Sequence, residues 1–182
     1  MKKIFTLILS AISILSFAQA PTTSATTPTE ADAGVISVFS DSYTDVTGTN
    51  FNPGWGQSTV YSAFDLSGDN MLKYAGLNYQ GIEFGSTINA ASKATLHMDI
   101  FSEETVDLAI FCISSTSGER SVSKSLTAGQ WTSVDIELSE YISQGLSVSD
   151  LVQFKFDEVA RTIAPTIYID NIYFYGTAAA TE

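Results

Sequence analysis

The sequence is poor in cysteine, histidine and basic residues. Its 182 residues include one cysteine, one histidine and eight Lys or Arg, against twenty Asp or Glu. Cys112 has no partner for an internal disulfide, and the apolar run 108–113 around it predicts a buried, unreactive thiol. A lone His97 has no second histidine with which to build a zinc site. The fold therefore has to be held by its apolar core, with a metal ion as an additional source of stability.

The scarcity of basic residues gives the chain a net charge of −12. Without Lys2 and Lys3, which fall in a predicted signal peptide, the charge becomes −14. Because an acidic surface repels nucleic acid and anionic membranes, we expect neither as a partner. The charge is compatible with neutral ligands and with divalent cations.

Long apolar runs are also missing, apart from one at the N-terminus. A basic start, the apolar run 4–17 and the triplet Ala18-Gln19-Ala20 follow one another. This order is typical of a secretory signal peptide cleaved after Ala20, and the run is shorter than the roughly 20 residues of a membrane span. We therefore predict a signal peptide over residues 1–20 and a secreted protein, either extracellular or periplasmic.

The composition divides the rest of the chain into three parts. Residues 21–33 are rich in Thr, Pro and Ala, which predicts a flexible spacer. From residue 34 to 176 the texture is uniform and the length suits one domain. Residues 177–182 are small or polar and predict a flexible tail.

The domain consists of short alternating runs separated by Gly, Pro, Asn and Asp turns. We expect strands at 35–39, 59–66, 71–75, 79–84, 95–101, 106–114, 121–126, 132–138, 151–157 and 166–175, with a helical turn at 139–144. So many strands in one domain indicate an all-β sandwich or barrel. Most strands have one apolar and one polar face, as two packed antiparallel sheets require.

The closing strand, residues 166–175, is the most apolar. Strict alternation would place Asp170 on one face with Ile172 and Phe174, and Asn171 on the other with Tyr173. A carboxylate in such a strand is costly unless a cation or hydrogen bonds satisfy it. We expect the partner of Asp170 to connect the end of the domain to its beginning.

Three segments together carry a family resemblance. They are Val38-Phe-Ser-Asp-Ser-Tyr-Thr-Asp45, Gly129-Gln-Trp-Thr-Ser-Val-Asp-Ile-Glu-Leu-Ser-Glu140 and Tyr168-Ile-Asp-Asn-Ile-Tyr-Phe174. In this order the chain resembles the jelly-roll carbohydrate-binding modules with a galactose-binding-like β-sandwich, found in secreted bacterial polysaccharide-degrading proteins. The resemblance covers residues 35–176. It implies a two-sheet antiparallel jelly-roll β-sandwich, a glycan ligand, glycoside hydrolases acting on the same glycan, and a structural Ca²⁺ between the first and last strands.

Sugar binding requires an exposed aromatic ring and nearby hydrogen-bonding groups. Trp55 is the strongest candidate, because its Gly- and Pro-rich loop is a poor place to bury an indole; the alternative is that it packs back on the sheet edge. Tyr74 and Tyr79 are further aromatic candidates, although tyrosines are often half-buried for structural reasons. Residues on polar strand faces complete the predicted set: Glu83, His97, Asp99, Gln153 and Lys155. Trp131 is interpreted as structural.

Calcium favours six to eight oxygen ligands, which carboxylates and carbonyls supply. Asp41 and Asp45 flank the exit of the first strand, and Asp170 lies on the last. If these strands are neighbours, one Ca²⁺ would neutralise all three carboxylates. The alternative is that Asp41 and Asp45 are solvated turn residues and that Asp170 caps a bulge.

No catalytic pattern is present in the sequence. It lacks the Glu-x-Asp-x-x-Glu strand of β-sandwich glucanases, a Gly-x-Ser-x-Gly elbow and a zinc cluster. We therefore expect a non-catalytic protein that binds a polysaccharide, with β-glucan suggested by the resemblance alone. Two alternatives stay open: a structural or adhesive cell-surface module, and an accessory-domain remnant of a glycoside hydrolase.

Overall fold

The computed structural model describes residues 19–178, so the predicted signal peptide lies largely outside the described residues. The described elements are η1 (Asp32–Gly34), β1 (Ile36–Phe39), β2 (Val60–Leu66), β3 (Asp69–Ala75), β4 (Gln80–Ile88), β5 (Thr95–Ser102), β6 (Val106–Ser114), β7 (Gly118–Leu126), β8 (Gln130–Glu137), α1 (Leu138–Ile142), β9 (Leu151–Glu158) and β10 (Ile167–Tyr175). Within residues 19–178 no helix has the length and apolarity needed to cross a membrane. The strand bounds lie close to the predicted ones.

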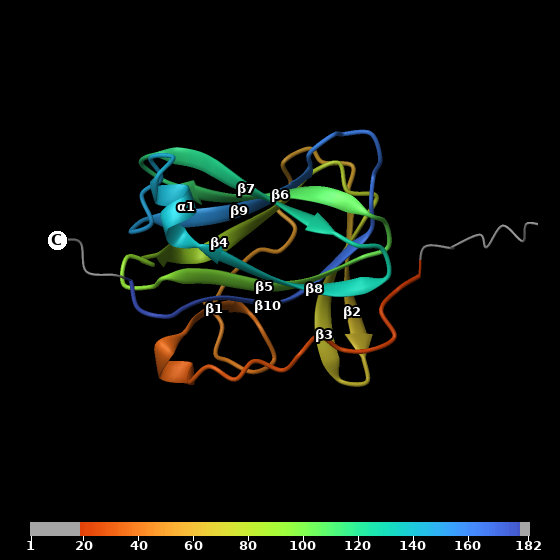
Figure 1. The fold of residues 1–182 in the computed structure, drawn as a ribbon, viewed down its shortest axis with the longest axis horizontal. Coiled ribbons are helices and arrows are strands. Elements are labelled where there is room, and N and C mark those ends of the chain that lie inside the picture. The colour runs from red at the N-terminus through yellow and green to blue at the C-terminus, as the bar shows by residue number, and fades with distance from the viewer. Residues whose placement is uncertain (1–18, 179–182) are drawn as a thin grey trace, which may run out of the picture.

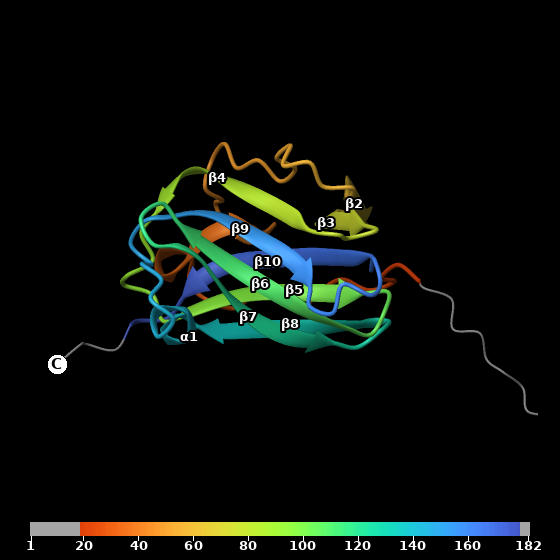
Figure 2. The same cartoon turned by 90° about the horizontal axis from the view of Figure 1, so that it is seen from above.

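The strands form two antiparallel sheets packed face to face (Figures 1 and 2). Sheet A has the order β2-β3-β10-β5-β8, and β1 also pairs with β10. On the side of β10 away from β5, residues 167–169 pair with β3 and residues 172–174 pair with β1. Sheet B has the order β4-β9-β6-β7. The predicted two-sheet antiparallel sandwich is confirmed.

The core lies between the sheets and consists of the inward side chains of both. Burial of this apolar area, at roughly 25 cal/mol per Å², is the main source of stability in a domain without disulfides. Cys112 is fully buried in this core, as predicted, and burial raises the pKa of its thiol to about 12. Tyr74 is in the core as well, with no exposed surface, and its hydroxyl donates to the carbonyl of Phe51 at 2.9 Å.

The closing strand β10 departs from the alternation that the sequence predicts. Its pairing with β5 shifts register between Asp170 and Tyr173, and Asn171 has a positive φ of 53°. This bulge inserts one residue, so Ile172 and Phe174 enter the core on the same side as Ile169. The prediction that Asp170 shares a face with Ile172 and Phe174 is therefore wrong.

Residues 19–31, which we call the N-terminal arm, lie along the outer face of sheet A. In Figure 1 the arm is the red-to-orange segment that passes across the β2–β3 hairpin and continues below β10. The carbonyls of Thr23 and Thr26 accept hydrogen bonds from Trp131 on β8 and Asn171 on β10. The expectation of a spacer over 21–33 did not anticipate these contacts.

Candidate functional site

The outer face of sheet B brings five of the predicted binding residues together. The register of its strands defines two rows across the sheet. One row is Gly81, Lys155, Phe111 and Ser121, and the next is Glu83, Gln153, Ile113 and Glu119. With strands about 4.8 Å apart, each row extends over roughly 14 Å. Trp55 and Tyr79 lie at the β4 end of these rows.

The indole of Trp55 lies over the backbone of Gly81. A Cβ built on Gly81 would come within 2.3 Å of Cζ3, 2.5 Å of Cη2 and 2.6 Å of Cε3 of the ring. Three adjacent ring atoms at similar distances indicate that a face of the ring, rather than its edge, covers the glycine. Trp55 is only partly buried, and the ring face against Gly81 is a covered one. Any side chain at residue 81 would prevent this arrangement.

Hydrogen bonds fix the ring in this position. Trp55 Nε1 donates to Glu83 Oε1 at 2.9 Å, and Gln153 Nε2 donates to the same oxygen at 3.3 Å. The hydroxyl of Tyr79 donates to the Trp55 carbonyl at 2.7 Å, and the backbone N–H of Trp55 donates to Gln57. The platform is therefore rigid before any ligand arrives, which lowers the ordering cost of binding.

A second aromatic ring lies in the same row, two strands away from Gly81. Phe111 on β6 is partly exposed, and Lys155 Nζ lies 3.9 Å from its ring centroid, a cation–π contact. Lys155 also forms a 2.6 Å ion pair with Glu119. Phe111 and Glu119 were not predicted as site residues. Their signal was available in the sequence, because Phe111 alternates with the buried Ile110 and Cys112.

The carboxylates of this face already have partners. Glu83 accepts from Trp55 and Gln153, and Glu119 pairs with Lys155. Asp157 pairs with Arg161 through Oδ2, while its Oδ1 is buried without a hydrogen-bond partner. A glycosidase needs one free carboxylic acid and one free carboxylate across the scissile bond.

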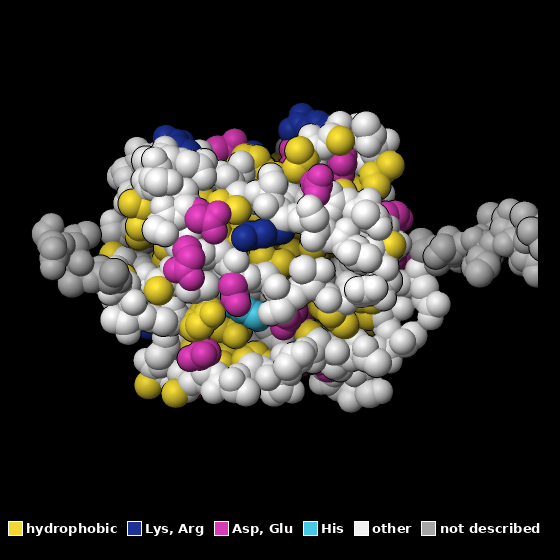
Figure 3. Space-filling model, in the orientation of Figure 1, with side chains coloured by type: hydrophobic (Ala, Val, Ile, Leu, Met, Phe, Trp, Pro, Cys, Tyr) yellow, Lys and Arg dark blue, Asp and Glu magenta, His cyan; other side chains and the backbone are white. Residues whose placement is uncertain are grey.

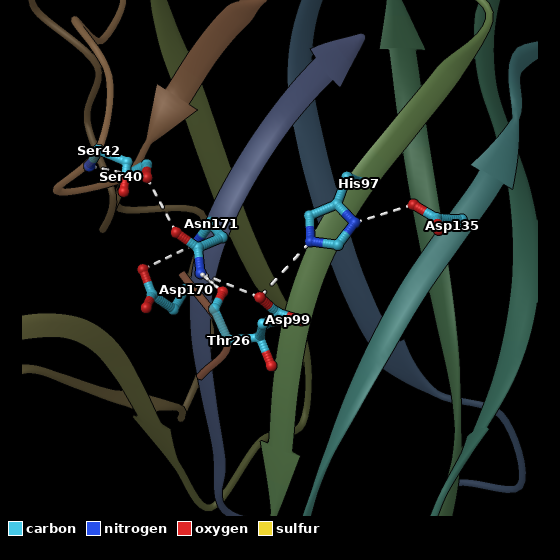
Figure 4. Close-up of polar contacts among 8 residues, drawn as sticks. All are labelled: Thr26, Ser40, Ser42, His97, Asp99, Asp135, Asp170 and Asn171. Carbon is cyan, nitrogen blue, oxygen red and sulfur yellow. Dashed lines mark hydrogen bonds and ion pairs between the residues drawn. The ribbon is translucent and has the colours of Figure 1, made fainter. Parts of the chain in front are cut away.

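The remaining predicted binding residues lie elsewhere. Tyr74 is corrected, because its ring is in the core and cannot contact a ligand. His97 and Asp99 belong to β5 of sheet A, on the opposite face of the sandwich (Figure 4). Periodicity alone could not distinguish the two outer faces, because it shows which residues point outward but not which sheet a strand joins.

On sheet A, His97 forms a network with carboxylates and the arm. Its Nδ1 lies 2.8 Å from Asp135 Oδ1 and its Nε2 lies 3.5 Å from Asp99 Oδ2. Asn171 donates to Asp99 at 2.9 Å and also to the arm carbonyl of Thr26. Burial lowers the pKa of His97, but the hydrogen bonds with Asp99 and Asp135 outweigh it and raise the pKa above 6.5. Figure 3 shows acidic side chains on either side of the histidine.

The predicted calcium ligands do not form one cluster. Asp45 accepts hydrogen bonds from Ser37 Oγ at 2.6 Å and from the Ser40 N–H at 3.3 Å. Asp41 and Asp170 instead line a cavity of about 180 Å³ with Asp69, between sheet A and the arm. Within the part of the chain that the structure describes, no group of three His, Cys, Asp or Glu side chains has the arrangement of a metal site.

This acidic cavity nevertheless contains one unsatisfied acceptor. Asp69 Oδ2 is buried without a hydrogen-bond partner, and Asp170 is only 2% exposed. Burial raises the pKa of Asp170 to about 7; the Asn171 N–H opposes this, and Asp69, Asp99 and Asp41 add to it. Asp69 was missed because the sequence showed it only as part of the turn 67–70.

Comparisons with known proteins agree with the fold. No protein-family model and no curated protein matches the chain. Among solved structures, a family 11 carbohydrate-binding module from Clostridium thermocellum, in complex with a beta-1,3-1,4-mixed-linked tetrasaccharide, has a TM-score of 0.53 at 15% identity. The match covers 81% of this chain and 98% of that one. The chain has the jelly-roll fold of carbohydrate-binding modules.

Modules of two further families show the same likeness. A family 30 carbohydrate-binding module has a TM-score of 0.54 at 15% identity, covering 81% of this chain and 90% of that one. A mutant of a family 29 module has a TM-score of 0.53 at 13% identity, covering 77% and 89%. At these identities the likeness shows the fold alone, so the function has to be argued from the surface of sheet B.

Proposed function

We propose that the protein is a non-catalytic module that binds a polysaccharide on the outer face of sheet B. The observation that carries the proposal is the partly exposed Trp55 ring, held flat on Gly81 and hydrogen-bonded to Glu83. The C–H groups on one side of a pyranose ring stack on such a surface, while Glu83, Gln153 and Lys155 hydrogen-bond the hydroxyls. The solved family 11 complex with a mixed-linked β-glucan fragment supports β-glucan as the first ligand to test.

Two features extend the proposal to cellular context. The N-terminal sequence pattern supports secretion with cleavage after Ala20, which mass spectrometry of the exported protein would test by finding Pro21 as its first residue. Polysaccharide binding outside the cell would place the protein beside glycoside hydrolases that act on the same glycan. The acidic charge supports neutral glycans over nucleic acid or membranes as partners.

Isothermal titration calorimetry against soluble glucans, xylans and mannans tests the proposal. We expect measurable binding of at least one neutral polymer, and a loss of about tenfold or more in the Trp55→Ala variant. Gly81→Ala should weaken binding similarly by displacing the ring. Gly54→Ala is the matched control, because a Cβ at residue 54 meets no atom within 4 Å in the same loop. Failure of the folded protein to bind any polymer would contradict the proposal.

Calcium is a second, separate proposal, supported by the unpartnered Asp69 Oδ2 and the buried Asp170. A Ca²⁺ would neutralise Asp41, Asp69 and Asp170 if their carboxylates drew together around it. Thermal unfolding should then show a midpoint several degrees higher in Ca²⁺ than in EDTA. The increase should disappear in Asp69→Asn and persist in Asp45→Asn. Equal unfolding midpoints with and without Ca²⁺ would refute the proposed calcium site.

A further inference from the structure

The N-terminal arm is bound by side chains as a separate peptide would be. Trp131 Nε1 donates to the Thr23 carbonyl at 2.8 Å, and Asn171 Nδ2 donates to the Thr26 carbonyl at 3.3 Å. The Tyr43 hydroxyl donates to the Glu30 carbonyl at 3.1 Å. Among the described residues, no backbone–backbone hydrogen bond joins residues 19–30 to sheet A. The arm is therefore not an added strand of the sheet.

The middle of the arm, from Thr23 to Pro28, has a three-residue spacing that a polyproline II segment would give. The two carbonyls that accept from Trp131 and Asn171 are three residues apart, and so are the partly buried Ala25 and Pro28. Ala31, where the arm ends, has φ −71° and ψ 133°. Polyproline II has three residues per turn and similar dihedral angles, and aromatic donors commonly recognise it.

The arm can leave its site without disturbing the core. The core between the sheets contains no buried residue before Val38, and Pro21 is the one arm residue among 19–31 that is buried. The arm connects to β1 through the single turn η1, in which a Cβ on Gly34 would meet no atom within 4 Å. Most arm side chains, including the threonines, face solvent, so sheet A contacts the arm mainly through its backbone carbonyls and small residues.

We propose that Trp131, Asn171 and Tyr43 form a docking site for an extended Thr/Pro-rich peptide, and that its occupant in trans is the arm of a second copy of this chain. An identical arm can make every contact that the arm makes in cis, so two copies can exchange arms without losing any of them. The exchange joins the copies through sheet A and leaves both sheet B faces free. Two glycan sites on one assembly would raise avidity, a consequence that rests on the proposed function; the docking itself does not.

A labelled synthetic peptide of residues 21–31 tests the docking site by fluorescence anisotropy. The protein used is the full chain with Ala25→Glu and Pro28→Glu, which place two glutamates against the acidic cavity and weaken the arm in cis. We expect this protein to bind the peptide, and to bind it about tenfold more weakly when Trp131→Phe and Tyr43→Phe are added. Both changes keep a ring and remove a donor. Tyr61→Phe, on β2, is the matched control.

Energy transfer in the otherwise wild-type protein tests the second copy. Donor and acceptor dyes are attached to separate batches at Thr29→Cys, an exposed arm residue, since Cys112 is buried. We expect transfer and a dimer mass by light scattering that increase with concentration, and loss of both in Trp131→Phe/Tyr43→Phe. No peptide binding overturns the docking site. A monomer at all concentrations, or dimers that persist in the double variant, overturns the second copy. Trp55→Ala should dimerise normally, which separates this result from glycan binding.

Discussion

The buried carboxyl of Asp170 makes stability depend on pH in a way that one substitution should remove. The side chain is 2% exposed and its pKa is raised from 3.8 to about 7, first by burial and then by the carboxylates of Asp69, Asp99 and Asp41. The Asn171 N–H donates to Asp170 Oδ1 at 2.7 Å, and the amide oxygen of Asn can accept this bond equally well. Asp170→Asn therefore removes the ionisation and keeps the backbone contact.

The magnitude follows from the shift. Below about pH 4 Asp170 is protonated in both the folded and unfolded states and does not affect stability. Between about pH 4 and pH 7 Asp170 ionises in the unfolded chain but stays protonated in the folded state, so the free energy of unfolding falls as pH rises. About three pKa units at about 1.4 kcal/mol each give a ceiling of about 4 kcal/mol, reached above pH 7.

Urea unfolding from pH 4 to pH 8 in EDTA, followed by circular dichroism, measures this effect. We expect Asp170→Asn to gain about 2–4 kcal/mol relative to the wild type between the two pH values, whatever its constant offset at pH 4. Asp65→Asn, at an exposed position in β2, controls for the loss of one negative charge, because the Asn oxygen can still accept from the Gly68 N–H. If the difference between Asp170→Asn and wild type is flat with pH, the assignment of a proton to Asp170 is refuted.

Three further predictions concern other groups. His97 should titrate in NMR with a midpoint above pH 6.5, and Asp135→Asn should lower that midpoint. Because the folded pKa is raised, the protonated ring stabilises the fold below about pH 6.5, and this stability is lost as pH rises through the folded pKa. A midpoint unchanged in Asp135→Asn would contradict the role of that hydrogen bond. Cys112 should resist iodoacetamide in the folded protein and react only on unfolding, since its thiol is buried with a pKa of about 12. Gly81→Ala should shift the fluorescence of Trp55 with little change in the unfolding midpoint, and an unchanged spectrum would show that the ring does not rest on Gly81.

The strands could be predicted because each carries its own period-two pattern between turn residues. The face of a strand is less predictable where backbone geometry intervenes. In β10 the left-handed Asn171 inserts a residue, and every side chain after it changes face. An Asp-Asn pair within a strand is the only local sign of this bulge. Tyr74 was misplaced for a related reason: a tyrosine beside a turn looks exposed, but its ring is buried and its hydroxyl donates to the carbonyl of Phe51.

The sequence predicted those site residues whose type and polar position alone suggest ligand binding. It could not predict which of them lie together, because strand pairing decides that. Trp55, Glu83, Gln153 and Lys155 meet on sheet B, but nothing local shows that β4 and β9 are neighbours. His97 and Asp99 have equally polar surroundings in sequence and lie on the other sheet. The sheet to which each strand belongs is set by long-range packing, which alternation does not encode.

The two outer faces of the sandwich differ in what covers them, and this difference favours sheet B as the ligand face. On sheet A the N-terminal arm lies across β10 and β8 and takes the donors of Asn171 and Trp131. On sheet B, Trp55 is partly exposed while its indole N–H is held by Glu83. A carbohydrate needs a flat apolar surface bordered by fixed polar groups. Trp131 is less suited to this role, since its ring packs against Phe101 and lines a cavity of about 410 Å³ that arm residues help to enclose.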